Sequence, residues 1–219
     1  KVVDGTEPYL YELRKDWNKQ APGEIALPTE IYREVIERRK RFKEIKELIL
    51  SGKIESINDF ITYNLNIRQF VQDVVETIDD PEFVKEFYKA LSSVTILDPT
   101  CGSGAFLFAA MNILEPLYES CIQRMESYVV EGGKGKYKFF EKELEIIKSP
   151  QHPNLAYFIY KSIILNNLYG VDIMKEAVEI AKLRFFLKLV ATVDVDHRKP
   201  NMGLEPLPDV DFNLRSGNT

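Results

Sequence analysis

Residues 1–27 form an irregular lead-in with few periodic apolar positions, and from residue 28 apolar positions recur at helical spacing. A long helix is predicted over residues 28–52, where apolar residues line one face and charges occupy the rest. Shorter helices are expected after Ser56, which suits an N-cap, then over residues 67–78, and from Pro81 in a first helical turn. The pattern therefore predicts a helical region over residues 1–92.

The pattern changes at residues 94–97, a short apolar run rich in β-branched residues that is typical of a buried strand. Asp98 ends this strand, and a tight loop with two glycines leads into an apolar helix over residues 105–113. Gly102 and Gly104 can adopt positive φ and let the backbone approach a ligand closely. The free N–H groups of the new helix then point at that ligand.

The loop does not fit a dinucleotide fingerprint, because Leu107 stands where the third glycine is needed. An acid before the glycines favours a cationic or hydroxyl-bearing ligand over a pyrophosphate. The sequence DPTCGSGAF resembles motif I of methyltransferases that use S-adenosylmethionine (SAM), in the form typical of enzymes that methylate amino groups in DNA. The alternative is an ordinary strand-to-helix turn of another α/β protein. The resemblance implies cofactor contacts from Asp98, Pro99, Thr100, Cys101, Gly102, Ser103, Gly104 and Phe106.

A second strand is predicted over residues 167–173, NLYGVDI, before a strongly periodic helix that starts at Lys175. Asp172 ends the strand, where a carboxylate can accept hydrogen bonds from both ribose hydroxyls of a nucleoside. Ile173 follows and could cover one face of an adenine. The residues GVDI resemble motif II of the same methyltransferases, and their position after motif I strengthens the resemblance.

The two motifs are far apart, since Gly104 and Asp172 are separated by 172 − 104 = 68 residues. A plain βαβ unit needs about 20 residues at this point. The extra length is predicted to hold a helix kinked or ended by Pro116, a flexible loop over residues 131–138 and further helices.

The chain's last stretch predicts a third strand over residues 212–215, followed by a turn that contains Asn218. Ligands of open α/β sheets bind at the carboxyl ends of the strands. An asparagine there can both donate to and accept from the edge of an adenine ring. The block resembles motif III, which implies an adenine contact for Asn218; a simple turn asparagine is the alternative.

Composition places the chain among globular proteins, with 45% hydrophobic and 29% charged residues in a length of 219. No signal peptide and no apolar run of about 20 residues is evident, so no membrane segment is expected. Cys101 and Cys121 lack metal-type spacing; no metal site is expected, and a reduced, cytoplasmic setting is the simple interpretation. His152 and His197 stand in predicted loops and are expected to be surface histidines.

The charge pattern is a weaker indication of function than the motifs. The net charge of −5 argues against a stand-alone nucleic-acid clamp but allows a local basic patch. The run Arg38–Arg41 fits either a phosphate contact or a solvated helix face laced with Glu37, Glu44 and Glu47. We favour the solvated face, because alternating charges on a helix surface are common.

Together these features predict an α/β fold: a partial, Rossmann-like SAM-dependent methyltransferase sheet over residues 93–219, preceded by the helical region. The motif region resembles the N6-adenine DNA methyltransferases of large methylase subunits and fused restriction–methylation enzymes of bacteria. The resemblance implies SAM as cofactor, methyl transfer to a flipped adenine in double-stranded DNA, and a role in restriction–modification or phage defence. It further implies that DNA is contacted mostly through parts outside this chain, with specificity or restriction subunits as partners.

The Asn-Pro-Pro-Tyr motif that holds the flipped adenine in that family does not occur in this sequence. No catalytic residue is therefore assigned, and the chain is expected to be a fragment that binds cofactor at most. Two alternatives remain: a methyltransferase that acts on RNA or a protein amide, and a non-catalytic nucleotide-binding module. Sequence beyond Thr219 would discriminate the first, and SAM binding the second.

Overall fold

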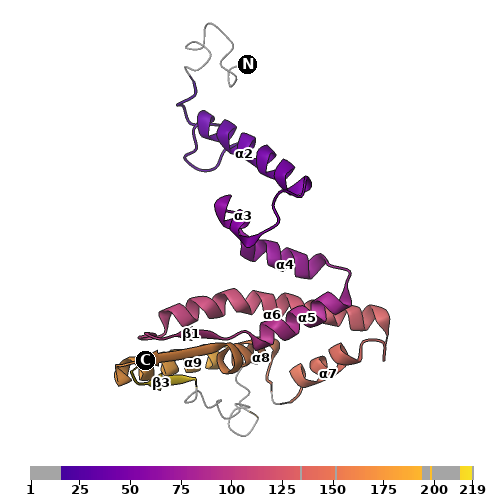
Figure 1. The fold of residues 1–219 in the computed structure, drawn as a ribbon, viewed down its shortest axis with the longest axis vertical. Coiled ribbons are helices and arrows are strands. Elements are labelled where there is room, and N and C mark those ends of the chain that lie inside the picture. Colours follow the sequence, from indigo (N-terminus) through magenta and orange to yellow (C-terminus); the bar gives the residue numbers. More distant parts are fainter. Residues whose placement is uncertain (1–15, 134, 151, 194–197, 199–212, 219) are drawn as a thin grey trace. The chain divides into compact units, whose positions relative to one another are not determined.

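The computed structural model describes residues 16–133, 135–150, 152–193, 198 and 213–218 (Figure 1). The chain divides into two compact units that meet between Ile67 and Arg68. His197 and Phe212, for which the sequence predicts a loop and a strand start, lie outside the described residues.

The first unit contains helices α2 (Tyr32–Leu50) and α3 (Ile57–Thr62). Helix α2 begins later than predicted, because Thr29 has a left-handed φ of 69° that helical geometry excludes. Helix α3 has the predicted cap: Ser56 Oγ accepts a hydrogen bond from the Asp59 N–H at 3.3 Å, and the Asp59 carboxylate accepts from the Ser56 N–H at 2.9 Å.

The second unit opens with helices α4 (Ile67–Thr77) and α5 (Pro81–Ser93), close to the predicted bounds. Asp80 caps α5 through hydrogen bonds of 3.0 and 3.3 Å from the next free N–H groups, and Pro81 occupies the first turn as expected. Helix α5 packs on the long helix α6 (Ala105–Gly132), with the rings of Tyr88 and Tyr118 edge to face. This packing joins α5 to the sheet-bearing unit, so the compact units divide earlier in the chain than residue 92.

Three parallel strands form one sheet in the order β1 (Ile96–Asp98), β2 (Leu168–Asp172) and β3 (Leu214–Ser216). Asp98 lies opposite Gly170, and Asp172 lies opposite Ser216. Because the strands are parallel, their carboxyl ends share one edge of the sheet, which brings the predicted motif ends together.

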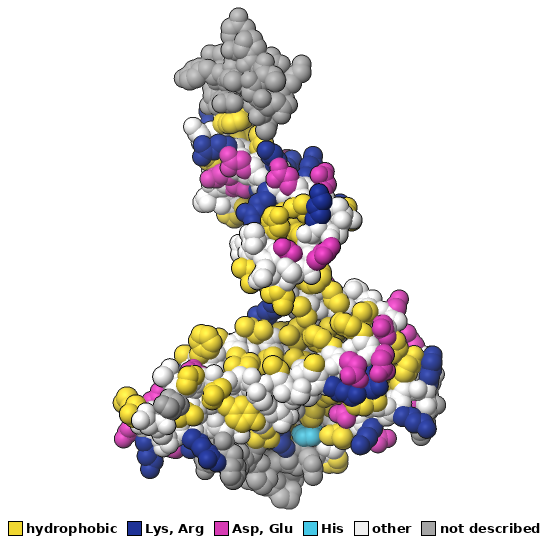
Figure 2. Space-filling model, in the orientation of Figure 1, with side chains coloured by type: hydrophobic (Ala, Val, Ile, Leu, Met, Phe, Trp, Pro, Cys, Tyr) yellow, Lys and Arg dark blue, Asp and Glu magenta, His cyan; other side chains and the backbone are white. Residues whose placement is uncertain are grey.

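The prediction that the first strand is buried is wrong. Leu97 is 62% exposed and Val94 is 43% exposed, because β1 pairs with β2 on one side only among the described strands. Hydrophobic side chains also gather on the visible face of this unit (Figure 2). The described residues thus leave the outer edge of β1 open.

The sequence predicts that Pro116 kinks or ends a helix. Helix α6 continues through Pro116, so the proline does not end it. A proline inside a helix removes one hydrogen bond at a cost of about 3 kcal/mol. Burial on both sides of the proline outweighs that cost, since Leu114 and Tyr118 both lie in the core. By length and composition alone α6 could cross a membrane, but its core positions account for its apolar character. The buried residues are Leu107, Met111, Leu114, Tyr118, Ser120, Cys121, Ile122, Met125 and Tyr128.

The described residues also include helices α7 (Lys138–Ile147), α8 (Leu155–Ser162) and α9 (Lys175–Val190). A π-helical stretch, η1 (Ile163–Asn167), joins α8 directly to β2. The loop predicted over residues 131–138 is shorter in the structure, because α6 extends to Gly132 and α7 begins at Lys138.

A buried asparagine, Asn167, joins the helices to the start of the sheet. The Asn167 side-chain amide donates to the carbonyls of Leu91 at 2.8 Å and Val94 at 2.7 Å. Its oxygen accepts a 3.0 Å hydrogen bond from the Tyr118 hydroxyl. Asn167 therefore ties the end of α5, helix α6 and the start of β2 into one core.

Candidate cofactor site

Asp172 connects the two predicted motifs directly. Its Oδ2 accepts a hydrogen bond of 2.7 Å from the Gly102 N–H, and its Oδ1 accepts one of 2.9 Å from the Met174 N–H. Both hydrogen bonds lower the pKa of the Asp172 carboxyl below its usual range, and the one from the Met174 N–H has the larger effect. Met174 is also the N-cap residue of α9, so Asp172 orders both the glycine loop and the start of that helix.

The glycine loop is fixed from inside the sheet. The Cys101 N–H donates a 3.0 Å hydrogen bond to the Val171 carbonyl, and this bond anchors the loop to β2. Asp98, which ends β1, accepts a 3.1 Å hydrogen bond from the Thr100 N–H and so sets the loop's first turn. The sequence DPTCG thus forms a short connection held at both ends.

The two motif glycines serve different purposes. Both have positive φ, 50° at Gly102 and 81° at Gly104. A Cβ at Gly102 would meet nothing within 4 Å, so this face of the loop is open to a ligand. A Cβ at Gly104 would lie 3.1 Å from the Ala181 side chain, so Gly104 allows the loop to pack against α9.

The third predicted segment reaches the same end of the sheet. The Gly217 N–H donates to the Asp172 carbonyl at 2.9 Å, and Asn218 follows as an exposed residue. Phe106 and Ile173 are 73% and 77% exposed, respectively, which leaves their apolar side chains available to cover a ligand ring. The structure therefore brings together the strand ends that carry Asp98, Asp172 and Asn218.

Cys101 is a packing residue within this loop. Burial, with the charges of Asp98 and Asp172, raises the pKa of its thiol, so the sulfur stays protonated near neutral pH. A Cβ placed on Gly170 would lie 2.9 Å from this sulfur, so the thiol packs closely against β2. We accordingly assign it no reactive role, although the motif match includes it.

Arg184 of α9 supports the loop and was not anticipated from the sequence. Its Nη1 donates to the Ser103 carbonyl at 2.8 Å, and its guanidinium lies over the Phe108 ring at 4.5 Å. Phe108 in turn stacks on Phe185 at 4.5 Å. Nothing in the sequence separates Arg184 from the other charged positions of a periodic helix, because its partner is a backbone carbonyl 81 residues away.

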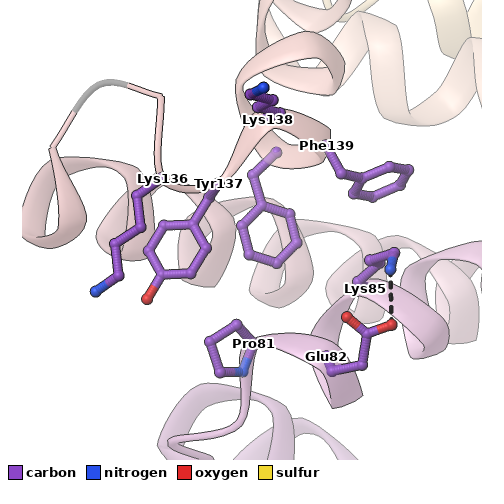
Figure 3. A pocket seen from close by; sticks show the side chains of 8 residues that line it. Pro81, Glu82, Lys85, Lys136, Tyr137, Lys138 and Phe139 are labelled. Carbon is purple, nitrogen blue, oxygen red and sulfur yellow. Dashed lines mark hydrogen bonds and ion pairs between the residues drawn. The ribbon is translucent and has the colours of Figure 1, made fainter.

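A separate pocket of about 180 Å³ lies between the start of α5 and the start of α7 (Figure 3). Glu82 and Lys85 form an ion pair of 2.6 Å on one of its sides, and Tyr137 and Phe139 extend from the other. None of the predicted cofactor residues lines it.

His152 has a local structural role. Its Nδ1 lies 3.0 Å from the Ile146 carbonyl, and its ring meets the edge of Phe158. The predicted absence of a catalytic role for His152 stays a prediction.

Comparison with known proteins assigns the chain to a protein family. The model of a family described as "MmeI, DNA-methyltransferase domain" matches residues 74–209, more than half of the chain. The chain belongs to this family. The match includes the glycine loop and Asp172 and ends before β3, and it confirms the predicted likeness to DNA methyltransferases.

A curated protein supports the same assignment. The chain is 33% identical over 177 residues to a protein of Methanocaldococcus jannaschii named "Putative type II restriction enzyme and methyltransferase". That alignment covers 81% of this chain but only 12% of the relative. No solved structure matches the chain.

Proposed function

We propose that this chain is the SAM-binding part of a DNA methyltransferase that transfers a methyl group to adenine N6 in a restriction–modification or phage-defence system. The observation that carries the proposal is the Asp172 carboxylate, which joins the motif I loop to the end of β2 through the Gly102 N–H. Membership of the DNA-methyltransferase family supports the reaction class. A cytoplasmic location, double-stranded DNA as substrate, and specificity or restriction subunits as partners belong to the same proposal.

The residues present fit SAM. The open face of Gly102 lets a ligand approach the backbone, and Asp172 keeps acceptor capacity, because a carboxylate has about four lone-pair sites and only two are occupied here. The exposed Phe106 and Ile173 side chains offer apolar cover for a ring. Asp98, the acid that ends β1 just before the glycines, disfavours a pyrophosphate over the loop, because like charges repel.

Each residue then has a physical task. Asp172 accepts hydrogen bonds from ribose hydroxyls, Asn218 reads the adenine edge, and the first N–H groups of α6 orient the cofactor's polar end. When bound, SAM supplies a methyl group that a nucleophilic nitrogen can accept. The protein contributes orientation and a preorganised electrostatic environment.

The partial Rossmann-like sheet fits this scheme. The open edge of β1 leaves room for a further strand, and the Asn-Pro-Pro-Tyr motif of the resembled enzymes is absent from this sequence. The chain by itself should therefore transfer no methyl group to mixed-sequence DNA above background. Clear incorporation of label from SAM into adenine by this chain would contradict the proposed division of labour.

Calorimetry tests the cofactor. The chain should bind SAM or S-adenosylhomocysteine more tightly than NAD, because Leu107 replaces the third glycine of a dinucleotide site. Tighter binding of NAD would overturn the proposal. Failure of all three ligands to bind would favour a non-catalytic module.

Activity of the full-length protein tests the substrate. The protein should transfer label from SAM to duplex DNA, and digestion to nucleosides should place the label on N6-methyladenine. Label in cytosine, RNA or protein would instead support one of the alternative methyltransferase classes.

A further inference from the structure

Most cations of the basic run in α2 have structural partners. Arg38 donates to both carboxylate oxygens of Glu30 at 2.9 Å and thereby lowers the pKa of Glu30 to about 2. Lys40 pairs with Glu44 at 3.7 Å, and Arg41 donates to the Tyr63 carbonyl at 2.7 Å. These contacts explain part of the run by packing within the first unit.

Three other cations of the same helix, Arg39, Lys43 and Lys46, form what we call the cation row. All three are exposed, and none has an ion pair or hydrogen bond with another residue in the part of the chain that the structure describes. At about 100° per residue they fall within an arc of roughly 60° on the helix surface.

Most acids of α2 lie on other faces of the helix: measured from Arg39 in the same way, Glu34, Glu37 and Glu44 are about 140° or more away. Glu47 lies about 80° from Arg39 and about 40° from Lys43, so it borders the row on one side. Glu34 caps the helix through the Ile31 N–H at 3.0 Å, and Glu37 lies 3.9 Å from Arg33. The cation row is thus a local positive strip on a chain whose net charge is −5.

The cation row also lies along a surface hollow whose length suits a stretch of DNA backbone. The cation row, Arg38 and the 64% exposed ring of Phe42 line one surface hollow. At a rise of about 1.5 Å per residue, the row extends roughly 10 Å along the helix axis. Phosphates of one DNA strand advance about 3.4 Å along the duplex axis, so the row can meet two or three of them.

We propose that the cation row of α2 binds the phosphate backbone of duplex DNA. The inference rests on the proposed function for its choice of polyanion, since a DNA methyltransferase meets duplex DNA as substrate. Contacts of this kind carry no sequence information; they add affinity that weakens with salt. Anionic lipid and acidic protein are the competing occupants, and the test includes both.

The test compares two triple variants of the whole chain with equal charge change. R39Q/K43Q/K46Q removes the row, and K19Q/R33Q/K40Q removes three exposed cations that already pair with Asp16, Glu37 and Glu44. Fluorescence anisotropy with a labelled 30-base-pair duplex is followed from about 50 to 300 mM salt. The row variant should lose at least about tenfold in affinity and reduce the salt slope by about 2 to 3, at roughly 0.9 per phosphate contact. The control should stay near wild type.

Equal losses in both variants would show an effect of net charge alone and overturn the proposal. Row-dependent binding that is tighter to anionic phospholipid vesicles or to polyglutamate than to the duplex would also overturn it. If the triple variant melts early, the double variant K43Q/K46Q serves instead, with an expected slope change of about 2. SAM affinity, measured on the same samples, tests the proposed function separately: a wild-type chain that binds DNA through the row but not SAM retains this inference and loses that function.

Discussion

At the scale of single residues, Asp172 resolves an apparent choice between two roles. A cofactor ligand and a helix-start residue are usually alternatives, yet one carboxylate here receives N–H groups from Gly102 and Met174 and still has lone pairs free. The same contacts that would preorganise the site also hold the loop. Substitutions should therefore change ligand affinity and fold stability together.

Asp172→Ala should lower SAM affinity about ten- to a hundredfold, since a hydrogen bond to a charged group contributes about 1.5–3 kcal/mol. It should also lower the melting temperature, because two backbone N–H groups lose their acceptor. Asp172→Asn should lose less of both. Calorimetry and thermal melting on the same samples measure this, with Glu179→Ala on α9 as the control; unchanged SAM affinity with a lower melting temperature would make Asp172 a purely structural residue.

The lowered pKa of Asp172 also predicts a pH dependence. A carboxyl whose pKa is lower in the folded state stabilises the fold above its unfolded pKa, near 3.8, and this contribution is lost as the pH falls through the folded value. The difference in melting temperature between wild type and Asp172→Asn should therefore shrink as the pH falls from about 6 to 3. A difference that grows toward acid pH would contradict the assigned contacts.

Gly170 tests the packing beneath the loop. A Cβ there would stand 2.8 Å from Leu214 and 2.9 Å from the Cys101 sulfur, so Gly170→Ala should destabilise the fold by about 1–3 kcal/mol. Gly23→Ala, where a Cβ meets nothing within 4 Å, is the matched control. Urea denaturation measures both, and equal midpoints would show that the sheet absorbs the added methyl group.

At the scale of elements, local chemistry was predictable and long-range packing was not. The glycine loop, the Ser56 cap and the strand ending at Asp172 follow from a few neighbouring residues, and each occurs as expected. The continuation of α6 through Pro116 depends on core contacts distant in sequence, which outweigh the local signal. The partial exposure of β1 likewise depends on which strands pair with it.

Arg184 is another residue whose role depends on long-range packing and could not be predicted from the sequence. It lies on α9 and donates a hydrogen bond to the Ser103 carbonyl of the glycine loop. Arg184→Gln should weaken SAM binding about three- to tenfold by loosening a preorganised loop, and Arg184→Lys should recover part of the loss. Lys182→Gln, which removes the half-buried partner of Glu179, is the control. The expected signature is a loss of affinity without a matching loss of stability; equal affinities in all variants would show that the loop needs no support from α9.

At the scale of the whole molecule, the chain separates into parts with different predicted tasks. Every predicted cofactor residue lies in residues 68–219, and the cation row lies in residues 1–67. The sequence suggested a later boundary, because three short helices in succession look alike until α5 is seen packed on α6. Contacts within each unit, rather than a change in composition, place the division.

This division leads to a prediction for the second unit alone. Residues 68–219 contain a continuous core around α6 and should fold and bind SAM within about threefold of the whole chain's affinity. The same truncation should lower the salt slope of duplex binding by about 2 to 3, since it removes the cation row. Calorimetry and anisotropy on the truncated and whole chains measure the two effects independently. A folded truncation that loses SAM binding more than tenfold would show that residues 1–67 contribute to the cofactor site, and an unchanged salt slope would remove the row from the DNA contact.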